Sequence, residues 1–304
     1  MSKDNLFFPR GFNPLHLPNK GLKPLGRIAS IIYLWLLKHT LFVILFLAAF
    51  GKITAQNLPL STASDSALFY YDKGWKMVMD EGNYSAAEEA YRKAVLFDSD
   101  FLVAQSLLGR ISGELREREE IAKMLEAKKA NLTGDERLLL DVYFELLKLM
   151  NVREKEPEKA PAQLEKALAL GEKNLNILVH RYPGEIYYKS EFIETIHYRQ
   201  GPAAALDSLR SLRRDEQKLN PFLLGYEAEL EGELGHYELA LKKAEVLASL
   251  FEGREIPKPN VVFADIYFKM GELEKARQEV DKALSLDPEN VDAIRLKKRI
   301  SEKK

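Results

Sequence analysis

Residues 257–290 read PKPNVVFADIYFKMGELEKARQEVDKALSLDPEN, and they have the clearest structural pattern in the chain. Apolar and small residues recur every three or four positions on both sides of Gly271, a spacing that predicts two amphipathic helices joined by a turn. Glycine suits such a turn because it tolerates a positive φ. Pro288 blocks continuation of the second helix. Three small residues lie where the two helices should approach each other: Ala264, Ala276 and Ala283.

This combination of positions resembles a tetratricopeptide repeat, a helix-turn-helix unit of 34 residues that stacks on copies of itself. The resemblance is carried by Phe263, Ala264, Tyr267, Gly271, Leu273, Ala276, Val280, Ala283 and the closing Asp287-Pro288. It implies that each unit shares its apolar face with its neighbours, so that several units form one array.

The same pattern recurs upstream with less regularity. The second-best copy starts at Leu68 and contains Tyr71, Gly82, Tyr84, Ala87, Tyr91, Ala94 and Asp98. Trp75 departs from the family pattern, which has a small residue there, so helix packing should differ locally. Further units are expected from Leu102 and over residues 141–174, 185–219 and 221–254. Runs with the period of two that is typical of strands are missing. We therefore predict an all-α fold, an α-solenoid of tetratricopeptide-like repeats over residues 68–290 with a polar capping helix over 291–304.

The N-terminal region predicts export or membrane anchoring. Residues 1–27 are expected to form a disordered leader and residues 51–67 a linker. Residues 28–50 are apolar apart from Lys38, His39 and small polar side chains. As a signal peptide this segment would have a basic start at Lys38-His39 and a cleavage site near Ala55. As an uncleaved anchor it would hold Lys38 near the bilayer centre, at a cost of about 2.5–3.5 kcal/mol.

Both interpretations place the repeats beyond the membrane, because basic residues precede the apolar run and favour the cytoplasmic side. These residues are Lys20, Lys23 and Arg27. We therefore expect the repeats in the periplasm or cell envelope of a bacterium. They would be soluble if the chain is cleaved near Ala55, and otherwise attached to the membrane through residues 28–50.

Composition excludes several classes of function. The 304 residues include no Cys, so disulfides, thiol catalysis and thiolate metal sites are excluded. Residues 1–55 hold seven Lys and Arg residues and one Asp, so residues 56–304 have 38 basic and 45 acidic side chains. This net negative charge makes nucleic acid an unexpected partner.

No catalytic motif accounts for the function. Glu194 and His197, like Glu233 and His236, have the Glu-x-x-His spacing of di-iron bundles, and we interpret both pairs as coincidences. His180 precedes a turn and is interpreted as a residue of a helix end or the surface. The aromatic residues of 69–75 and 187–188 are interpreted as packing rather than a ligand cage. We expect no enzyme, no metal and no cofactor.

Because tetratricopeptide arrays line their concave groove with the first helix of each pair, the resemblance implies a set of candidate contacts. These are Phe69, Asp72, Lys73, Lys76, Met79, Asp80, Val103, Ser106, Leu107, Arg110, Lys258, Val261, Val262, Asp265, Phe268 and Lys269. We predict an exported, non-catalytic scaffold that binds a protein or peptide segment there. Two alternatives stay open: a helical-repeat enzyme or ligand receptor that uses the irregular residues 175–200, and a purely structural assembly factor of a membrane complex.

Overall fold

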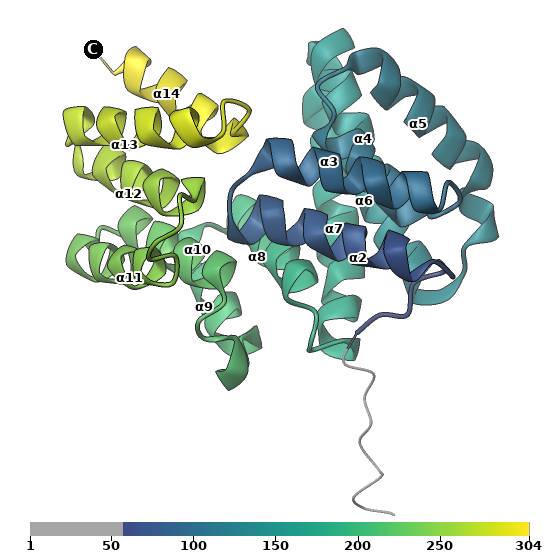
Figure 1. Ribbon diagram of the computed structural model, residues 1–304, viewed down its shortest axis with the longest axis horizontal. Helices are drawn as coiled ribbons and strands as arrows, with labels where there is room; N and C mark the ends of the chain where they lie inside the picture. The colour runs from purple at the N-terminus through teal and green to yellow at the C-terminus, as the bar shows by residue number, and fades with distance from the viewer. Residues whose placement is uncertain (1–56, 304) are drawn as a thin grey trace, which may run out of the picture. The chain divides into compact units, whose positions relative to one another are not determined.

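The computed structural model describes residues 57–303, so the predicted leader, the signal or anchor segment and residues 51–56 of the predicted linker lie outside the described residues. Thirteen α-helices, α2 to α14, account for most of the described chain (Figure 1). No strand occurs between residues 57 and 303. None of the helices in this range combines the length and the apolar character that a membrane span requires. The predicted all-α fold class is confirmed.

Consecutive helices pack as pairs, as expected for a tetratricopeptide-like array. The pairs are α2 (Asp65–Trp75) with α3 (Tyr84–Phe97), α4 (Leu102–Ile111) with α5 (Leu115–Lys128), α6 (Gly134–Lys155) with α7 (Ala160–Arg181), α8 (Ile186–Gln200) with α9 (Pro202–Leu212), α10 (Pro221–Glu233) with α11 (Tyr237–Ser249), and α12 (Pro257–Met270) with α13 (Leu273–Leu286), followed by the single helix α14 (Val291–Glu302). The third pair extends beyond the expected residues 141–174, because both of its helices have 22 residues.

The last pair follows the repeat pattern closely. Gly271 ends α12 with a φ of 82°, the left-handed conformation that glycine adopts without strain. The three alanines expected at the helix contact are fully buried: Ala264, Ala276 and Ala283. Helix α14 covers the exposed end of this pair, and its Ala293, Leu296 and Ile300 complete the local core. The side chain of Asn290 caps α14 by accepting a hydrogen bond from the backbone N–H of Ala293.

The first pair departs from the pattern at Trp75, where α2 gives way to a π-helical turn, η1 (Lys76–Asp80). The close helix approach has moved to Gly74, since a Cβ there would lie only 2.3 Å from Cε1 of Tyr91 on α3. A π-helical turn adds one residue to a helix, so the neighbouring position takes over the small-residue role. Trp75 is thereby free to stack on Tyr187 of α8, with ring centroids 5.4 Å apart.

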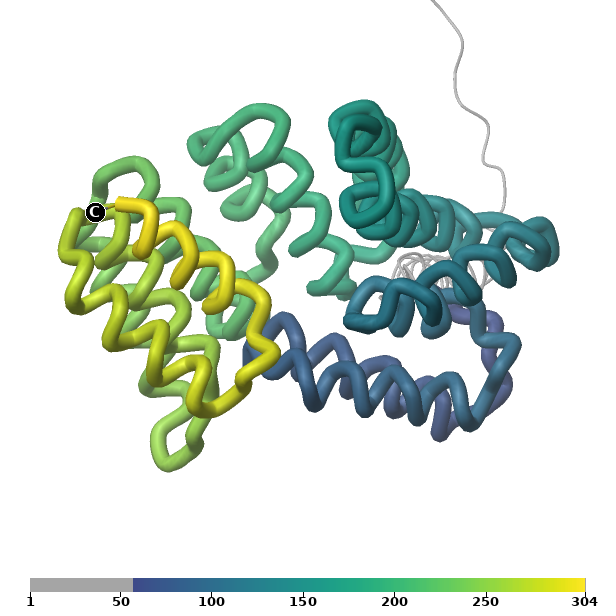
Figure 2. Tube along the Cα trace, turned by 90° about the horizontal axis from the view of Figure 1, so that it is seen from above, coloured from purple at the N-terminus to yellow at the C-terminus, as the bar shows by residue number. Residues whose placement is uncertain are grey.

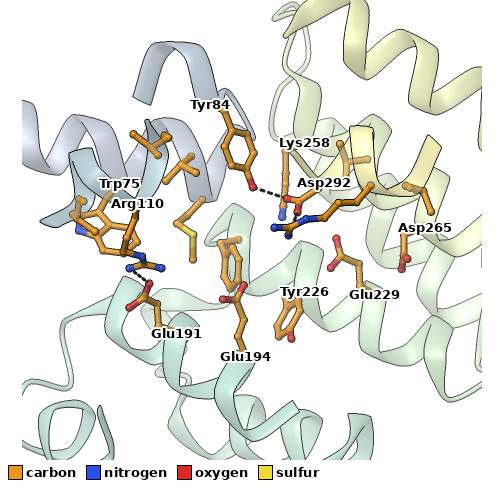
Figure 3. Close-up of a pocket in the computed structure, with 18 of the residues that line it drawn as sticks. Trp75, Tyr84, Arg110, Glu191, Glu194, Tyr226, Glu229, Lys258, Asp265 and Asp292 are labelled. Atoms are coloured by element: carbon orange, nitrogen blue, oxygen red, sulfur yellow. Dashed lines mark hydrogen bonds and ion pairs between the residues drawn. The ribbon is translucent and has the colours of Figure 1, made fainter. Parts of the chain in front are cut away.

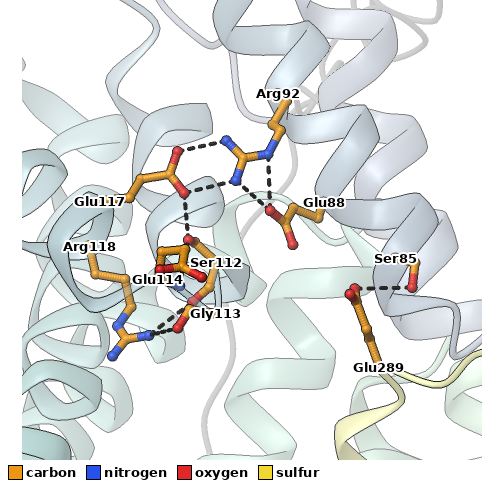
Figure 4. A network of polar contacts seen from close by, with 9 residues as sticks. All are labelled: Ser85, Glu88, Arg92, Ser112, Gly113, Glu114, Glu117, Arg118 and Glu289. Atoms are coloured by element: carbon orange, nitrogen blue, oxygen red, sulfur yellow. Dashed lines mark hydrogen bonds and ion pairs between the residues drawn. The ribbon is translucent and has the colours of Figure 1, made fainter.

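The first two pairs are joined by a polar network between α3 and α5 (Figure 4). Arg92 of α3 contacts Glu117 of α5 at 2.6 Å and Glu88 on its own helix at 2.5 Å. Glu117 also accepts a 2.5 Å hydrogen bond from Ser112, in the turn before α5. Arg92 is largely exposed, so this network orients the two pairs and contributes little to the free energy of unfolding.

Candidate functional site

The site begins with a contact between the two ends of the array, made by residues 80–85, which we call the closing segment. This segment connects η1 to α3 and lies against the last repeat; the blue and yellow parts of the trace meet there in Figure 2. The Gly82 carbonyl accepts a 2.6 Å hydrogen bond from the side chain of Asn290. The Glu81 carbonyl accepts a 3.0 Å hydrogen bond from the backbone N–H of Lys258. The array therefore closes on itself instead of ending in an open groove.

Asp287 strengthens this closure because it binds the start of α3. Its carboxylate accepts hydrogen bonds of 2.6 Å from both the backbone N–H of Tyr84 and the hydroxyl of Ser85. The Tyr84 N–H is unpaired in an isolated helix, since the backbone N–H groups of the first turn have no intrahelical acceptors. Asp287 is only 2% exposed, so the interaction is shielded from water.

Asp80 extends the closure to the middle of the array. One of its carboxylate oxygens accepts hydrogen bonds from the Asn220 side chain at 3.0 Å and the Phe222 backbone N–H at 3.3 Å, at the start of α10. The other accepts a 3.0 Å bond from the hydroxyl of Tyr187. Burial raises the pKa of Asp80, and these hydrogen bonds act against that rise. One short segment thus contacts three later repeats.

Beneath the closing segment lies a cavity of about 440 Å³, which we call the inner cavity (Figure 3). Most of its walls come from the first helix of successive pairs, with additions from η1, α3 and the capping helix α14. Its lining residues are Trp75, Val78, Met79, Tyr84, Tyr91, Leu107, Arg110, Ile111, Glu191, Glu194, Phe222, Tyr226, Glu229, Lys258, Val261, Asp265, Asp292, Arg295, Leu296 and Arg299. Its volume is within the range of about 300–1,000 Å³ that ligand sites occupy.

Some charges in the inner cavity are paired. The Arg110 guanidinium lies 2.6 Å from the carboxylate of Glu191, which is 5% exposed. The Tyr84 hydroxyl donates a 2.8 Å hydrogen bond to Asp292, so the closing segment reaches the cavity wall. Asp265 lies 2.5 Å from the ammonium group of Lys269. These contacts fix the positions of the paired groups.

Other polar groups in the cavity have no partner among residues 57–303. The carboxylates of Glu194, an exposed residue, and Glu229, a half-buried one, make no hydrogen bond or ion pair there, and neither does the ammonium group of Lys258, a residue that is only 6% exposed. The Tyr91 hydroxyl is buried without a hydrogen-bond partner. Unpaired buried polar groups are rare in folded proteins, and each one calls for a water or a ligand. The polar lining of the cavity therefore suits water or a polar ligand.

The two free carboxylates hold their protons unusually strongly. Glu194 is an exposed residue, but the protein that surrounds its carboxyl group raises its pKa to about 8, and the charges of Glu191 and Asp292 raise it further. Burial also raises the pKa of Glu229 to about 7, although Lys258 acts against that rise. Groups with such shifted pKa values cluster at functional sites.

The candidate contacts from the sequence divide among several surroundings. Those that line the inner cavity are Met79, Leu107, Arg110, Lys258, Val261 and Asp265. A side pocket of about 520 Å³ adjoins the cavity and contains Asp265, Phe268 and Lys269. A separate N-terminal pocket of about 660 Å³ contains Phe69, Asp72, Lys73 and Lys76. Val103, Ser106 and Val262 are fully buried and cannot touch a ligand in this conformation. Asp80 lies in the closing segment.

Several cavity residues were not among the candidates. Those on α8 and α10 include Glu191, Glu194 and Glu229, and they could have been found by applying the groove positions to the irregular middle repeats. Those on α14, including Asp292 and Arg295, carry no such signal, because a capping helix lines a cavity only when the array closes. The closure depends on contacts between residues about 200 positions apart, which no local pattern indicates.

The three histidines of residues 57–303 lie outside the inner cavity. His180 contacts a carbonyl of its own helix, that of Asn176, at 2.7 Å. His197 lines the side pocket, where Nδ1 lies 2.7 Å from the Tyr226 hydroxyl. His236 lies 2.7 Å from Glu231 and so does not pair with Glu233. Within residues 57–303, no three His, Asp or Glu side chains are grouped so that they could hold a metal ion.

Comparison with known families agrees with the repeat architecture at the C-terminal end. Residues 259–290 match the tetratricopeptide repeat family model. No curated protein has a sequence similar enough to this chain to match it. The matched segment covers α12 from residue 259 onwards, α13 and the Asn290 cap, so it includes Asp287 and Asn290, two of the residues that hold the closing segment.

Proposed function

We propose that this protein is a non-catalytic scaffold that binds a peptide segment of a partner protein in the inner cavity. The observation that carries the proposal is the cavity itself, a space lined by the inner helices and containing buried polar groups without partners. Tetratricopeptide repeats generally mediate contacts between proteins, and one such repeat forms part of the cavity wall.

A peptide suits this space better than a folded surface does. The inner cavity and the side pocket share the wall residues Tyr226, Glu229, Asp265 and Arg299, so together they offer an elongated space. At the end of the inner cavity away from the side pocket, the wall includes Trp75 and the ion pair of Arg110 and Glu191. A chain that enters along the side pocket would therefore end at this wall.

We further propose that the array works beyond a cytoplasmic membrane, released or anchored through residues 28–50. This part of the proposal rests on the apolar sequence of that segment and on the basic residues before it.

Peptide display against the full-length chain tests the binding function. Peptides selected in this way should lose at least tenfold in affinity for Met79→Trp, because the larger side chain fills the inner cavity. Leu96→Trp is the matched control, since Leu96 is 80% exposed outside that cavity, and it should bind as the parent chain does. Circular dichroism verifies that both variants fold. Equal affinity of the two variants would count against the cavity as the binding site.

A ligand receptor is the second candidate, and one observation favours it. Glu191 and Glu194, from the irregular residues 175–200, both line the inner cavity. His180 and His197 do not line it, so the catalytic form of this alternative lacks its expected base. Thermal-shift measurements with single amino acids and simple sugars distinguish the two candidates. A receptor would be stabilised by such a small molecule and would not bind the displayed peptides.

A further inference from the structure

We propose, resting on the anchored form of the function above, that an exposed face of the first helical pair docks on the surface of the lipid bilayer. The docking surface, which we call the aromatic patch, consists of Leu68, Phe69, Tyr70 and Phe97. In the anchored chain this patch holds the first pair against the membrane, close to the anchor.

The first argument is the exposed apolar surface of the patch. Phe69 on α2 is 62% exposed, and Phe97 at the end of α3 is 51% exposed. Tyr70 joins them, because the centre of its ring lies 5.2 Å from that of Phe69 and 5.6 Å from that of Phe97. Helices α2 and α3 pack side by side (Figure 1), so the three rings form one surface. Adjoining exposed apolar residues mark interaction surfaces, whereas single ones need no explanation.

The second argument is that the patch continues into the N-terminal pocket. Leu68 and Phe69 both line this pocket of about 660 Å³, and most of its other walls are apolar or aromatic. These walls include Leu58, Leu60 and Ile186. Exposed rings beside an apolar hollow suit the boundary between headgroups and acyl chains, where aromatic and leucine side chains insert into a bilayer.

The third argument is the length of chain between the patch and the apolar segment, which favours a membrane over a protein partner. Asn57 lines the same pocket as Phe69. Six residues, 51–56, separate Asn57 from Phe50, the last residue of the apolar segment. Since an extended chain spans at most about 3.6 Å per residue, the distance from Phe50 to Asn57 is no more than about 25 Å. An anchored chain therefore keeps the patch near the bilayer.

Lysines border the patch, as they do at many membrane surfaces. Lys73 and Lys76 line the N-terminal pocket, and the ammonium group of Lys93 lies 5.5 Å from the centre of the tyrosine ring of the patch. Two carboxylates lie among them: Asp72 lines the same pocket, and Glu89 contacts Lys93 at 2.5 Å. The positive excess is therefore small. Insertion of the rings should provide most of the docking, and anionic lipids should add little to it.

The experiment uses the full-length chain in lipid nanodiscs. Because the sequence contains no cysteine, one introduced cysteine carries one fluorescent NBD group. The label is placed at Leu68→Cys in the patch or at Leu250→Cys after α11, two positions that are 38% and 37% exposed. Lipids that carry a nitroxide on the acyl chain quench only a label that reaches the bilayer. We expect quenching at residue 68 to exceed that at residue 250 by at least about threefold, with phosphatidylcholine alone and with added phosphatidylglycerol.

A second set of variants separates docking from simple tethering. Phe69→Ser combined with Phe97→Ser should reduce the quenching at residue 68 to background. Leu239→Ser combined with Val246→Ser, at exposed positions of α11, should leave it unchanged. Circular dichroism verifies that both variants fold. Unchanged quenching without the two phenylalanines would overturn the proposal, because the short connection to the anchor would then account for the position of the label. Equal quenching at the two labelled positions would overturn it as well.

Failure of this proposal can be told apart from failure of the proposed function. A chain that does not insert into the discs removes the anchored form, and the docking with it. A chain that inserts but fails the quenching test removes only the docking. Binding of displayed peptides to the same discs, and its loss in Met79→Trp, tests the inner cavity independently of both.

Discussion

The first and last helical pairs contain the same marker residues but use them differently. In the last pair, α12 and α13 meet through three buried alanines, and the turn glycine Gly271 has open space around it. In the first pair, the turn glycine Gly82 lies against another part of the chain, because a Cβ there would come within 3.3 Å of the Lys258 backbone. The turn of the last pair follows the repeat pattern without further contacts, whereas the turn of the first pair contacts the other end of the array.

The π-helical turn of the first pair leads into the residues that make this long-range contact. A turn of this kind changes the direction in which the following residues point. Asp80, the last residue of the turn, reaches the start of α10, and Glu81, directly after it, reaches the start of α12. A departure from the repeat pattern therefore marks the place where the array gains its long-range contacts and its cavity.

The largest effect should come from the helix contact that is particular to the first pair. Gly74→Ala places a methyl group 2.3 Å from a ring carbon of the buried Tyr91. We expect the free energy of unfolding to fall by about 1–3 kcal/mol, since overpacking outweighs the better helix propensity of alanine. Urea unfolding of the full chain followed by circular dichroism measures it.

The matched control is Gly113→Ala, where no atom lies within 4 Å of the added methyl group. It should change the free energy of unfolding by less than about 0.5 kcal/mol. If both variants were equally stable, α2 and α3 could not be packed as closely as described.

The second prediction compares equivalent positions at the ends of the first and last pairs. Asp287 and Asp98 occupy equivalent positions near the ends of α13 and α3, but only Asp287 binds the closing segment. Asp287→Ala should cost about 1–2 kcal/mol, as the loss of a helix cap does. Hydrogen exchange should also become faster in the first turn of α3, around Tyr84 and Ser85.

Asp98→Ala removes a 2.6 Å hydrogen bond from Thr62 and one from a nearby backbone N–H in a more exposed setting. Its cost should stay below about 1 kcal/mol. A larger loss for Asp98→Ala than for Asp287→Ala would reverse the contrast between the two ends.

The smallest effect is the dependence of stability on pH through Glu194. Its pKa is raised to about 8, above its unfolded value, so between about pH 4.5 and 8 the folded chain retains a proton that the unfolded chain has lost. Stability attributable to this group therefore falls as pH rises through that window. Glu194→Gln should have a higher melting temperature than the parent chain at pH 8.5 and a smaller difference at pH 5. A variant with the same difference at both values would show that Glu194 ionises normally.

Much of the fold could be predicted from the sequence because the repeat signal is local. Gly271 and the three buried alanines of the last pair lie within 34 consecutive residues, and their spacing predicts the helical pair. The departure at Trp75 was also visible as a mismatch. Its consequence, the transfer of the small-residue role to Gly74, depends on the π-helical turn, which has no sequence signal of its own.

The candidate site was harder to predict because it depends on the two ends meeting. Arg110 and Lys258 were expected in a groove, and both line the inner cavity. Glu194 and Asp292 come from an irregular repeat and a capping helix, where the groove pattern gives little guidance. Val103 and Val262 were expected in the groove as well, and the tight packing of successive helices buries them instead.

The contact between Gly82 and Asn290 has a consequence for how the chain is made. These residues are 208 positions apart, so at about 5–20 residues per second the first hairpin waits roughly 10–40 s for its partner to leave the ribosome. During that interval the start of α3 lacks Asp287, and Asp80 waits a shorter time for Asn220 and Phe222. In a linear repeat array each unit can fold on its predecessor as it emerges. Here the C-terminal repeat and the capping helix α14 are the last components of the inner cavity to be synthesised, so a ribosome that stops early releases a chain whose cavity lacks these walls.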